Sequence, residues 1–447
     1  MTTLADLQNA LMRGETTAAA LAEAALSKAQ APGGEGARVF TKLYAERARA
    51  MAGASDALRA SGIVRSPLEG IPVSIKDLFD VAGETTRAGS VALDDAPPAA
   101  CSAPVVDRLI AAGAVLVGRT NMTEFAYSGL GLNPHYGTPL NPFDRATGRI
   151  PGGSSSGAAV SVTDGMAAAA IGSDTGGSVR IPAALCGLTG FKPTARRVPR
   201  EGALPLSTTL DSIGPLAASV ACCAVLDAIL SGEPVDLPQP ASLAGLRFAV
   251  PTTLALDGLD ETVGAAFEAA RERLARAGAR IEEIAVPEFA RLAEINARGG
   301  FTASEAWHWH RGLIEKAADR YDPRVVGRIR RGAEMSAADY LDVLAARSAW
   351  IAAVETRVAG FDALLMPTVP VIAPTIAELA DDARYGAANL LILRNPTLIN
   401  FLDGCALSLP CHAQGTAPVG LMIAGTAGQD RRILGIGLAV EAALAGA

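Results

Sequence analysis

The sequence predicts an α/β protein built around a mostly buried sheet, and two observations favour this class. From Ile71 onward, short β-favouring segments alternate with helical segments, and a second alternation of the same kind begins at Leu246. Hydrophobic residues make up 50% of the 447 residues and charged residues 19%, which is typical of a folded chain and not of a disordered one. At roughly 150 residues per domain, the length allows two or three domains or one large α/β unit.

The N-terminal region predicts a pair of helices over residues 3–31 and 38–62. Apolar residues recur there at helical spacing, and Pro32-Gly33-Gly34 interrupts the pattern. Residues 63–230 form the predicted α/β centre. Its expected elements are strands at 71–75 and 114–117, a helix at 103–112 and a helix of small residues at 158–171.

The C-terminal half predicts a further strand, helix and strand over residues 246–286. Residues 301–360 are charged and have helical periodicity. Residues 362–447 return to apolar segments punctuated by proline, which predict strands, and they end in an expected helix at 431–444.

Charge and cysteine content exclude several classes of function. Acidic residues outnumber basic ones by 46 to 39, and no basic cluster is dense enough to follow a phosphate backbone, so we expect no direct contact with nucleic acid. Six cysteines form no CxxC pair, which predicts a reducing compartment and no cysteine-bound metal.

Two further features favour a cytoplasmic location without membrane contact. Residues 1–30 carry charges throughout a helical pattern, which predicts no secretion signal. The most apolar stretches, at 212–226 and 363–380, are below or near the length of a bilayer span, and the second holds three prolines.

Two segments rich in glycine and serine, at 151–157 and 172–182, are the outstanding local feature. A flexible linker has a similar composition, but a linker would not carry a fixed Asp174 and Arg180 or border an apolar helix. Glycines before a serine let consecutive backbone N–H groups point into one cavity, which is the geometry that an oxyanion needs. The expected donors are the N–H groups of Thr175, Gly176, Gly177 and Ser178.

A serine nucleophile also needs a base. None of the four histidines has an obvious carboxylate partner nearby in sequence, and we expect them to be surface or packing residues. They are His135, His308, His310 and His412. Lysines are scarce, and Lys76 ends an apolar strand, where burial disfavours the ammonium and leaves an amine that can accept a proton. The alternative is a lysine that extends from the strand end to solvent or pairs with Asp77.

Four ordered motifs resemble the defining stretch of the amidase signature family. They are Gly70–Phe79, Pro151–Gly157, Gly172–Pro182 and Cys186–Thr194. Two further segments, 118–126 and 418–422, extend the likeness, which is dense over residues 60–230 and looser toward the C-terminus.

The resemblance implies one large α/β domain over residues 1–447, with a central mixed sheet covered by helices on both faces. Its expected parts are peripheral N-terminal helices at 1–62, the catalytic core at 63–230, a peripheral helical segment at 300–345, and C-terminal strands and a helix at 362–447 that complete the sheet.

The resemblance also implies a catalytic set of serine, cis-serine and lysine and no cofactor. Ser178 matches the nucleophile, Ser154 the serine that follows a cis peptide bond, and Lys76 the base. The implied reaction converts a small-molecule amide into a carboxylate and ammonia through an acyl-enzyme.

Residues near this set receive supporting or substrate-binding roles. We expect Asp174 and Arg180 to brace the loop, and Ser155 to support the catalytic set through hydrogen bonds. Tyr127 and Ser128 follow a segment in which members of the family often contact substrate; the alternative is a packed aromatic beside a loop serine.

The family also includes the glutaminase component of the glutamine-dependent tRNA amidotransferase, which is the alternative function. Its members hold the amino acid with an arginine and an aspartate. Arg328 resembles the arginine element, and its alternatives are a contact to a substrate carboxylate or a solvated helix face. The place of the aspartate is occupied by Leu393, which favours a stand-alone amidase.

Two other interpretations are weaker. Gly153 to Gly157 formally fits the nucleophile elbow of α/β-hydrolases with Ser155 as nucleophile, but no buried strand precedes it. A non-enzymatic scaffold would be expected to have lost part of the catalytic set. Members of the family are often dimers, so a homodimer is possible, but no residue here decides the oligomeric state.

Overall fold

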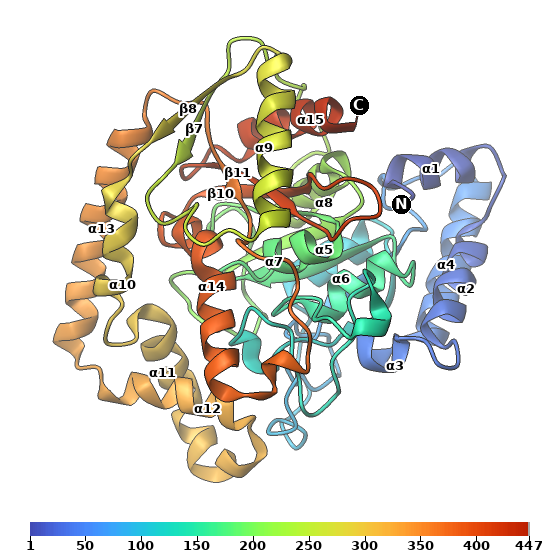
Figure 1. Ribbon diagram of the computed structural model, residues 1–447. Helices are drawn as coiled ribbons and strands as arrows, with labels where there is room; N and C mark the ends of the chain where they lie inside the picture. Colours follow the sequence, from blue (N-terminus) through green and yellow to red (C-terminus); the bar gives the residue numbers. More distant parts are fainter. Residues whose placement is uncertain (446–447) are drawn as a thin grey trace.

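The computed structural model describes residues 1–445, which form an α/β fold around one mixed sheet (Figure 1). Its strands are β1 (Phe40–Leu43), β2 (Pro72–Lys76), β3 (Val115–Thr120), β4 (Ala169–Asp174), β5 (Thr189–Lys192), β6 (Ser212–Ala217), β7 (Arg247–Pro251), β8 (Arg280–Ile284), β9 (Ala363–Pro367), β10 (Cys405–Pro410) and β11 (Gly420–Gly425). In space their order is β1-β3-β2-β4-β6-β5-β10-β11-β9-β7-β8. The strands from the C-terminal region therefore lie inside the sheet, between β5 and β7.

Helices cover both faces of this sheet. They are α1 (Leu4–Met12), α2 (Ala18–Ala29), α3 (Gly36–Val39), α4 (Ala45–Ala60), α5 (Pro104–Ala111), α6 (Ser156–Thr163), α7 (Arg180–Cys186), α8 (Val220–Ser231), α9 (Glu261–Arg276), α10 (Leu292–Ile295), α11 (Gly300–Ala317), α12 (Pro323–Arg330), α13 (Ala337–Val358), α14 (Asp382–Phe401) and α15 (Asp430–Ala445). Side chains alternate along β4, so that Ala170 packs in one cluster with α6 and α7, whereas Ile171 packs in another with α5 and α8. The predicted fold class is confirmed.

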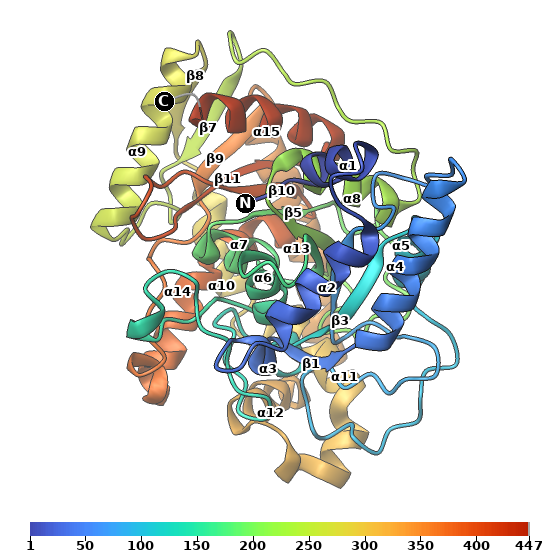
Figure 2. The ribbon, with the colours of Figure 1, turned by 90° about the vertical axis from the view of Figure 1, so that its right-hand side faces the viewer.

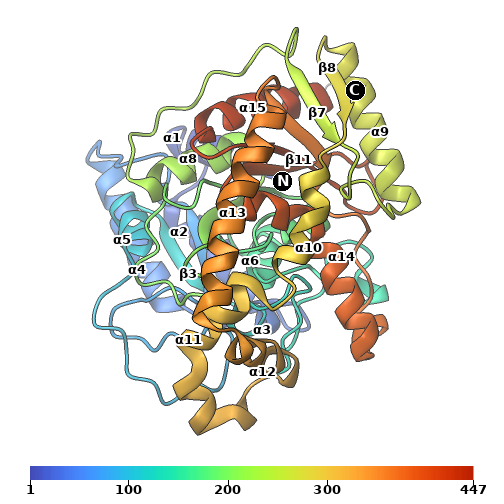
Figure 3. The ribbon, with the colours of Figure 1, turned by 90° about the vertical axis from the view of Figure 1, so that its left-hand side faces the viewer.

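Helices also flank the sheet at two opposite sides of the molecule. Figure 2 shows α1, α2 and α4 on one side, and Figure 3 shows α10, α11 and α13 on the other. No helix within residues 1–445 combines the length and apolarity that crossing a bilayer requires.

The N-terminal helices differ from the prediction in two places. The expected helix at 3–31 is divided, because Gly14 adopts a left-handed conformation (φ +69°) and Thr17 then caps α2 by accepting from the Ala20 N–H. The expected helix at 38–62 begins with a strand, since residues 40–43 pair with β3 and only residues 45–60 are helical.

Two further elements were wrongly predicted from periodicity. The expected helix at 158–171 ends at Thr163, because Gly165 turns the chain in a left-handed conformation (φ +67°) and β4 then begins at Ala169. Residues 382–401 form the long helix α14 although Pro396 lies inside it, so the C-terminal region is not made of strands and one helix alone.

Candidate active site

Lys76 lies at the end of β2 with its side chain fully buried, as the apolar strand predicts. Its Nζ donates to Ser154 Oγ over 2.7 Å and to Ser173 Oγ over 2.9 Å. Burial lowers the pKa of Lys76 to about 7, and the charges of Asp174 and Asp211 oppose that shift. The lysine is therefore positioned and electrostatically suited to exchange a proton with a serine hydroxyl near neutral pH.

Ser154 lies in a tightly packed loop before α6. The peptide bond between Gly153 and Ser154 is cis, as the resemblance implies, and the Ser154 carbonyl accepts from the Thr123 N–H. A Cβ on Gly153 would lie 2.5 Å from the Gly131 N atom, so only glycine fits there. This close packing fixes the loop that directs Ser154 toward Lys76.

Ser178 lies in the turn before α7, and its backbone carbonyl accepts from the Ser155 N–H over 3.3 Å. Within residues 1–445, no hydrogen bond joins the Ser154 and Ser178 hydroxyls; the structure shows the link from Lys76 to Ser154 and not the next one. Ser155 also donates weakly from Oγ to the Ser173 carbonyl, over 3.4 Å.

The expected set of oxyanion donors needs one correction. The Gly177 N–H donates to Asp174 Oδ1 over 2.8 Å, so this group is already engaged within the loop. The N–H groups of Thr175, Gly176 and Ser178 donate to no other group in the described part of the chain. Three of the four predicted donors are therefore available to a ligand.

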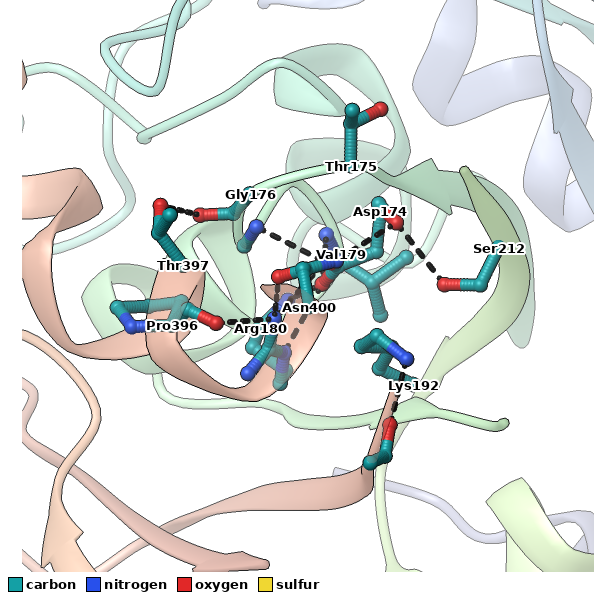
Figure 4. Close-up of polar contacts among 12 residues, drawn as sticks. Asp174, Thr175, Gly176, Val179, Arg180, Lys192, Ser212, Pro396, Thr397 and Asn400 are labelled. Atoms are coloured by element: carbon teal, nitrogen blue, oxygen red, sulfur yellow. Dashed lines mark hydrogen bonds and ion pairs between the residues drawn. The ribbon is translucent and has the colours of Figure 1, made fainter. Parts of the chain in front are cut away.

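Asp174 and Arg180 form a buried ion pair that braces this loop, as the sequence predicts (Figure 4). The guanidinium donates twice to the carboxylate, over 2.9 and 3.0 Å, and it also donates to the Asn400 side chain and to the Pro396 carbonyl on α14. Burial alone would raise the pKa of Asp174, but the adjacent Arg180 holds it well below its usual range. The loop is thus anchored to α14 by a charged network.

The three predicted substrate-binding residues have protein partners. Arg328 Nη1 donates to the Tyr127 carbonyl over 2.6 Å, and the guanidinium also lies over the Tyr385 ring. Ser128 Oγ donates to Asn389 Oδ1 over 2.8 Å. The structure therefore brings Tyr127 and Arg328 together across 201 residues of sequence, and Arg328 does not lie on a solvated helix face.

Among the histidines, His135 differs from the prediction because it does have a carboxylate partner. Its Nε2 lies 2.8 Å from Glu124 Oε1, and Glu124 also accepts from the Ser90 hydroxyl and the Asp322 N–H. This hydrogen bond raises the pKa of His135. In residues 1–445, His135 forms no hydrogen bond with the lysine or the two serines, so the pair braces the segment before Tyr127.

Two site residues were missed by sequence reasoning, Ser173 and Asp211. Ser173 lies beside Lys76 because β2 and β4 are parallel neighbours, with Ile75 opposite Ile171. Asp211 accepts from the Thr175 hydroxyl over 2.5 Å. No sequence signal specifies which strands are neighbours, although both residues directly flank residues singled out by the motifs or by strand patterning.

The whole arrangement matches a known family. A family model described as Amidase matches residues 21–434. The chain belongs to the amidase family. It is accordingly a hydrolase that acts on carbon–nitrogen bonds, and the predicted membership of the amidase signature family is confirmed.

Named relatives of this amidase include stand-alone enzymes and one component of a larger enzyme. The chain is 40% identical to a 2-amino-5-chloromuconic acid deaminase of Comamonas testosteroni, over 89% of this chain and 86% of the relative. It is 34% identical to one of the subunits of the glutamyl-tRNA(Gln) amidotransferase of Chloroflexus aggregans, over 98% and 96%. A solved structure described as an amidase superposes with a TM-score of 0.88 and 35% identity, over 99% of both chains.

A cavity of about 310 Å³ opens beside the glycine-rich loop of this amidase. Ser173, Thr175 and Asp211 contribute to its wall, together with residues 200–206 and Ala126. On another side of the same loop lies Leu393, since a Cβ on Gly176 would be 3.5 Å from Leu393 Cδ2. The amidase site therefore has a polar wall on one side and an apolar one on the other.

Proposed function

We propose that the chain hydrolyses a small-molecule carboxamide to a carboxylate and ammonia through Ser178, Ser154 and Lys76. The observation that carries this proposal is the buried contact of 2.7 Å between Lys76 Nζ and Ser154 Oγ. A lysine with a pKa of about 7 is partly neutral at physiological pH, and a neutral amine can accept a proton.

Acylation begins when neutral Lys76 takes the proton of the Ser154 hydroxyl while Ser154 takes the proton of Ser178. The Ser178 oxygen then forms a bond to the amide carbon, and the carbonyl electrons move to its oxygen. The N–H groups of Thr175, Gly176 and Ser178 stabilise this oxyanion. Loss of one such donor costs on the order of 10² to 10³ in rate in comparable sites.

The intermediate collapses when the carbonyl bond re-forms and the bond from carbon to nitrogen breaks. Ser154 donates its proton to the departing nitrogen and recovers one from the Lys76 ammonium, so ammonia leaves and the lysine is neutral again. Water then attacks the acyl-enzyme by the same relay, which releases the carboxylate and restores the Ser178 hydroxyl.

The proposed substrate is a small amide of a stand-alone enzyme, and not glutamine. An α-amino group needs a counter-charge, whereas the position beside Gly176 and Gly129 is held by Leu393. Arg328 is half-buried beside Tyr127 and is the proposed partner of a substrate carboxylate. The named deaminase of Comamonas testosteroni, whose substrate is an acid, supports an acidic amide.

The test is ammonia release from benzamide, a short aliphatic amide, malonamate, indole-3-acetamide and glutamine. Wild type is compared with Ser178→Ala and Lys76→Met. We expect release from at least one amide other than glutamine, and its loss in both variants. Release from glutamine alone would favour the amidotransferase function, and full activity of Ser178→Ala would overturn the assigned nucleophile.

A further inference from the structure

The loop that presents the oxyanion donors is anchored on a second side, away from the ion pair of Asp174 and Arg180. In Figure 4 the Thr175 side chain points away from that ion pair. Its hydroxyl donates to Asp211 Oδ1 over 2.5 Å. The contact follows from strand pairing, because β4 and β6 are antiparallel with Asp174 opposite Ser212, so the next residues outward are Thr175 and Asp211.

Asp211 is itself held rigidly by the segment before it. Its two carboxylate oxygens accept from the backbone N–H groups of Leu206 and Ser207, over 3.0 to 3.1 Å. Arg200 Nη1 donates to the Asp211 carbonyl over 3.1 Å. The carboxylate is therefore a fixed acceptor, and the Thr175 hydroxyl completes its hydrogen bonds.

We infer that Asp211 is a positioning residue for the reaction: by holding the Thr175 hydroxyl, its carboxylate fixes the backbone from Thr175 to Ser178 that carries the oxyanion donors. This inference rests on the proposed function. Displacement of such donors by about 1 Å can cost on the order of 10²-fold in rate, because preorganised donors act only at the right distance.

The same carboxylate has a second effect, through its charge. The negative charges of Asp174 and Asp211 raise the pKa of Lys76 against the larger lowering by burial. The other charged groups around Asp211 are Arg200 at its carbonyl, Glu201 on the cavity wall, and Glu305 of α11, which accepts from the Ser207 hydroxyl. Burial raises the pKa of Asp211 to about 6, so the carboxylate is mostly charged at neutral pH.

Two variants separate these effects, using the amide that wild type hydrolyses best. In Thr175→Val the loop loses its anchor but Asp211 keeps its charge; we expect kcat to fall on the order of tenfold to hundredfold, KM to stay within about twofold, and the acid limb of the pH profile to stay in place. In Asp211→Asn we expect a similar fall in kcat and a shift of the acid limb to lower pH, because the lysine loses a stabilising charge.

Three comparisons make the test specific. Thr175→Ser should restore kcat, and the double variant should be no slower than the slower single variant, because both changes remove one interaction. Thr194→Val is the matched control, since the Thr194 hydroxyl donates to Asp430 over 2.7 Å at a buried place outside the site; it should lower the melting temperature and leave kcat unchanged.

Wild-type kcat in Thr175→Val, or independent, multiplicative effects of the two changes, would overturn the inference. If Asp211→Asn does not fold, Thr175→Val and Thr175→Ser still decide it. Failure of the proposed function has a different signature, namely full activity of Ser178→Ala or Lys76→Met in the same assay.

Discussion

Lys76 Nζ lies 2.7 Å from Ser154 Oγ, and both side chains are fully buried. A buried ammonium is costly unless it is paired with a charge, and the nearest partners of this lysine are the neutral hydroxyls of Ser154 and Ser173. The site therefore favours the neutral amine and keeps it beside a hydroxyl. This relationship is what a proton relay requires, and it sets the first prediction.

The rate of acylation should follow deprotonation of Lys76. Because only the neutral amine accepts a proton, kcat/KM should rise with pH through about 7 and level off above it. Initial rates of ammonia release between pH 5.5 and 9.5 check this, with the melting temperature measured at each pH. A profile that falls across the same range would contradict the lysine as base.

Removal of the lysine should stabilise the protein while abolishing activity. Folding lowers the pKa of Lys76 from 10.5 to about 7, so between these values the unfolded state binds more protons and wild-type stability rises with pH. Lys76→Met avoids this cost, and its melting temperature should exceed that of wild type at pH 7 by an amount that shrinks toward pH 10. A difference that does not depend on pH would argue against a neutral buried lysine.

The ion pair of Asp174 and Arg180 should be important for stability. Arg180→Met leaves a buried carboxylate without its cation, which typically costs about 3 to 5 kcal/mol. Urea unfolding measures this loss. The matched control is Arg13→Met, because the Arg13 and Glu15 side chains pair at the surface over 2.6 Å and such pairs contribute less than about 1 kcal/mol. Equal effects of the two changes would contradict the bracing role.

Arg328 should distinguish acidic from neutral amides. Arg328→Gln removes the cation and can still donate to the Tyr127 carbonyl, so KM should rise at least about tenfold for an amide that bears a carboxylate and change little for a neutral one. Ammonia release from malonamate and from a neutral aliphatic amide compares the two. A parallel loss for both amides would assign Arg328 to the support of Tyr127 alone.

Much of the site was predictable because its chemistry lies in short contiguous motifs. The glycine pairs that shape the loops, the serines that follow them and the lysine at a strand end are local features, and the structure places Lys76 and Ser154 in contact as predicted. The use of the Gly177 N–H by Asp174 is also local, since a carboxylate often accepts from an N–H three residues later.

Contacts between distant segments could not be predicted in this way. Ser173 reaches Lys76 and Asp211 reaches Thr175 only because β2, β4 and β6 are neighbours in the sheet, and a single sequence does not specify strand order. In the fold, α14 was missed because Pro396 suggested a break, yet tertiary packing retains the helix through it.

The most direct test of the account is to map the serine that reacts with phenylmethylsulfonyl fluoride, by peptide mass spectrometry of the full chain. The sulfonyl group should appear on Ser178 alone, at a rate that rises with pH through about 7 and drops strongly in Lys76→Met and Ser154→Ala. Labelling of Ser155, or labelling of Ser178 at the wild-type rate in both variants, would contradict the assignment of nucleophile and relay.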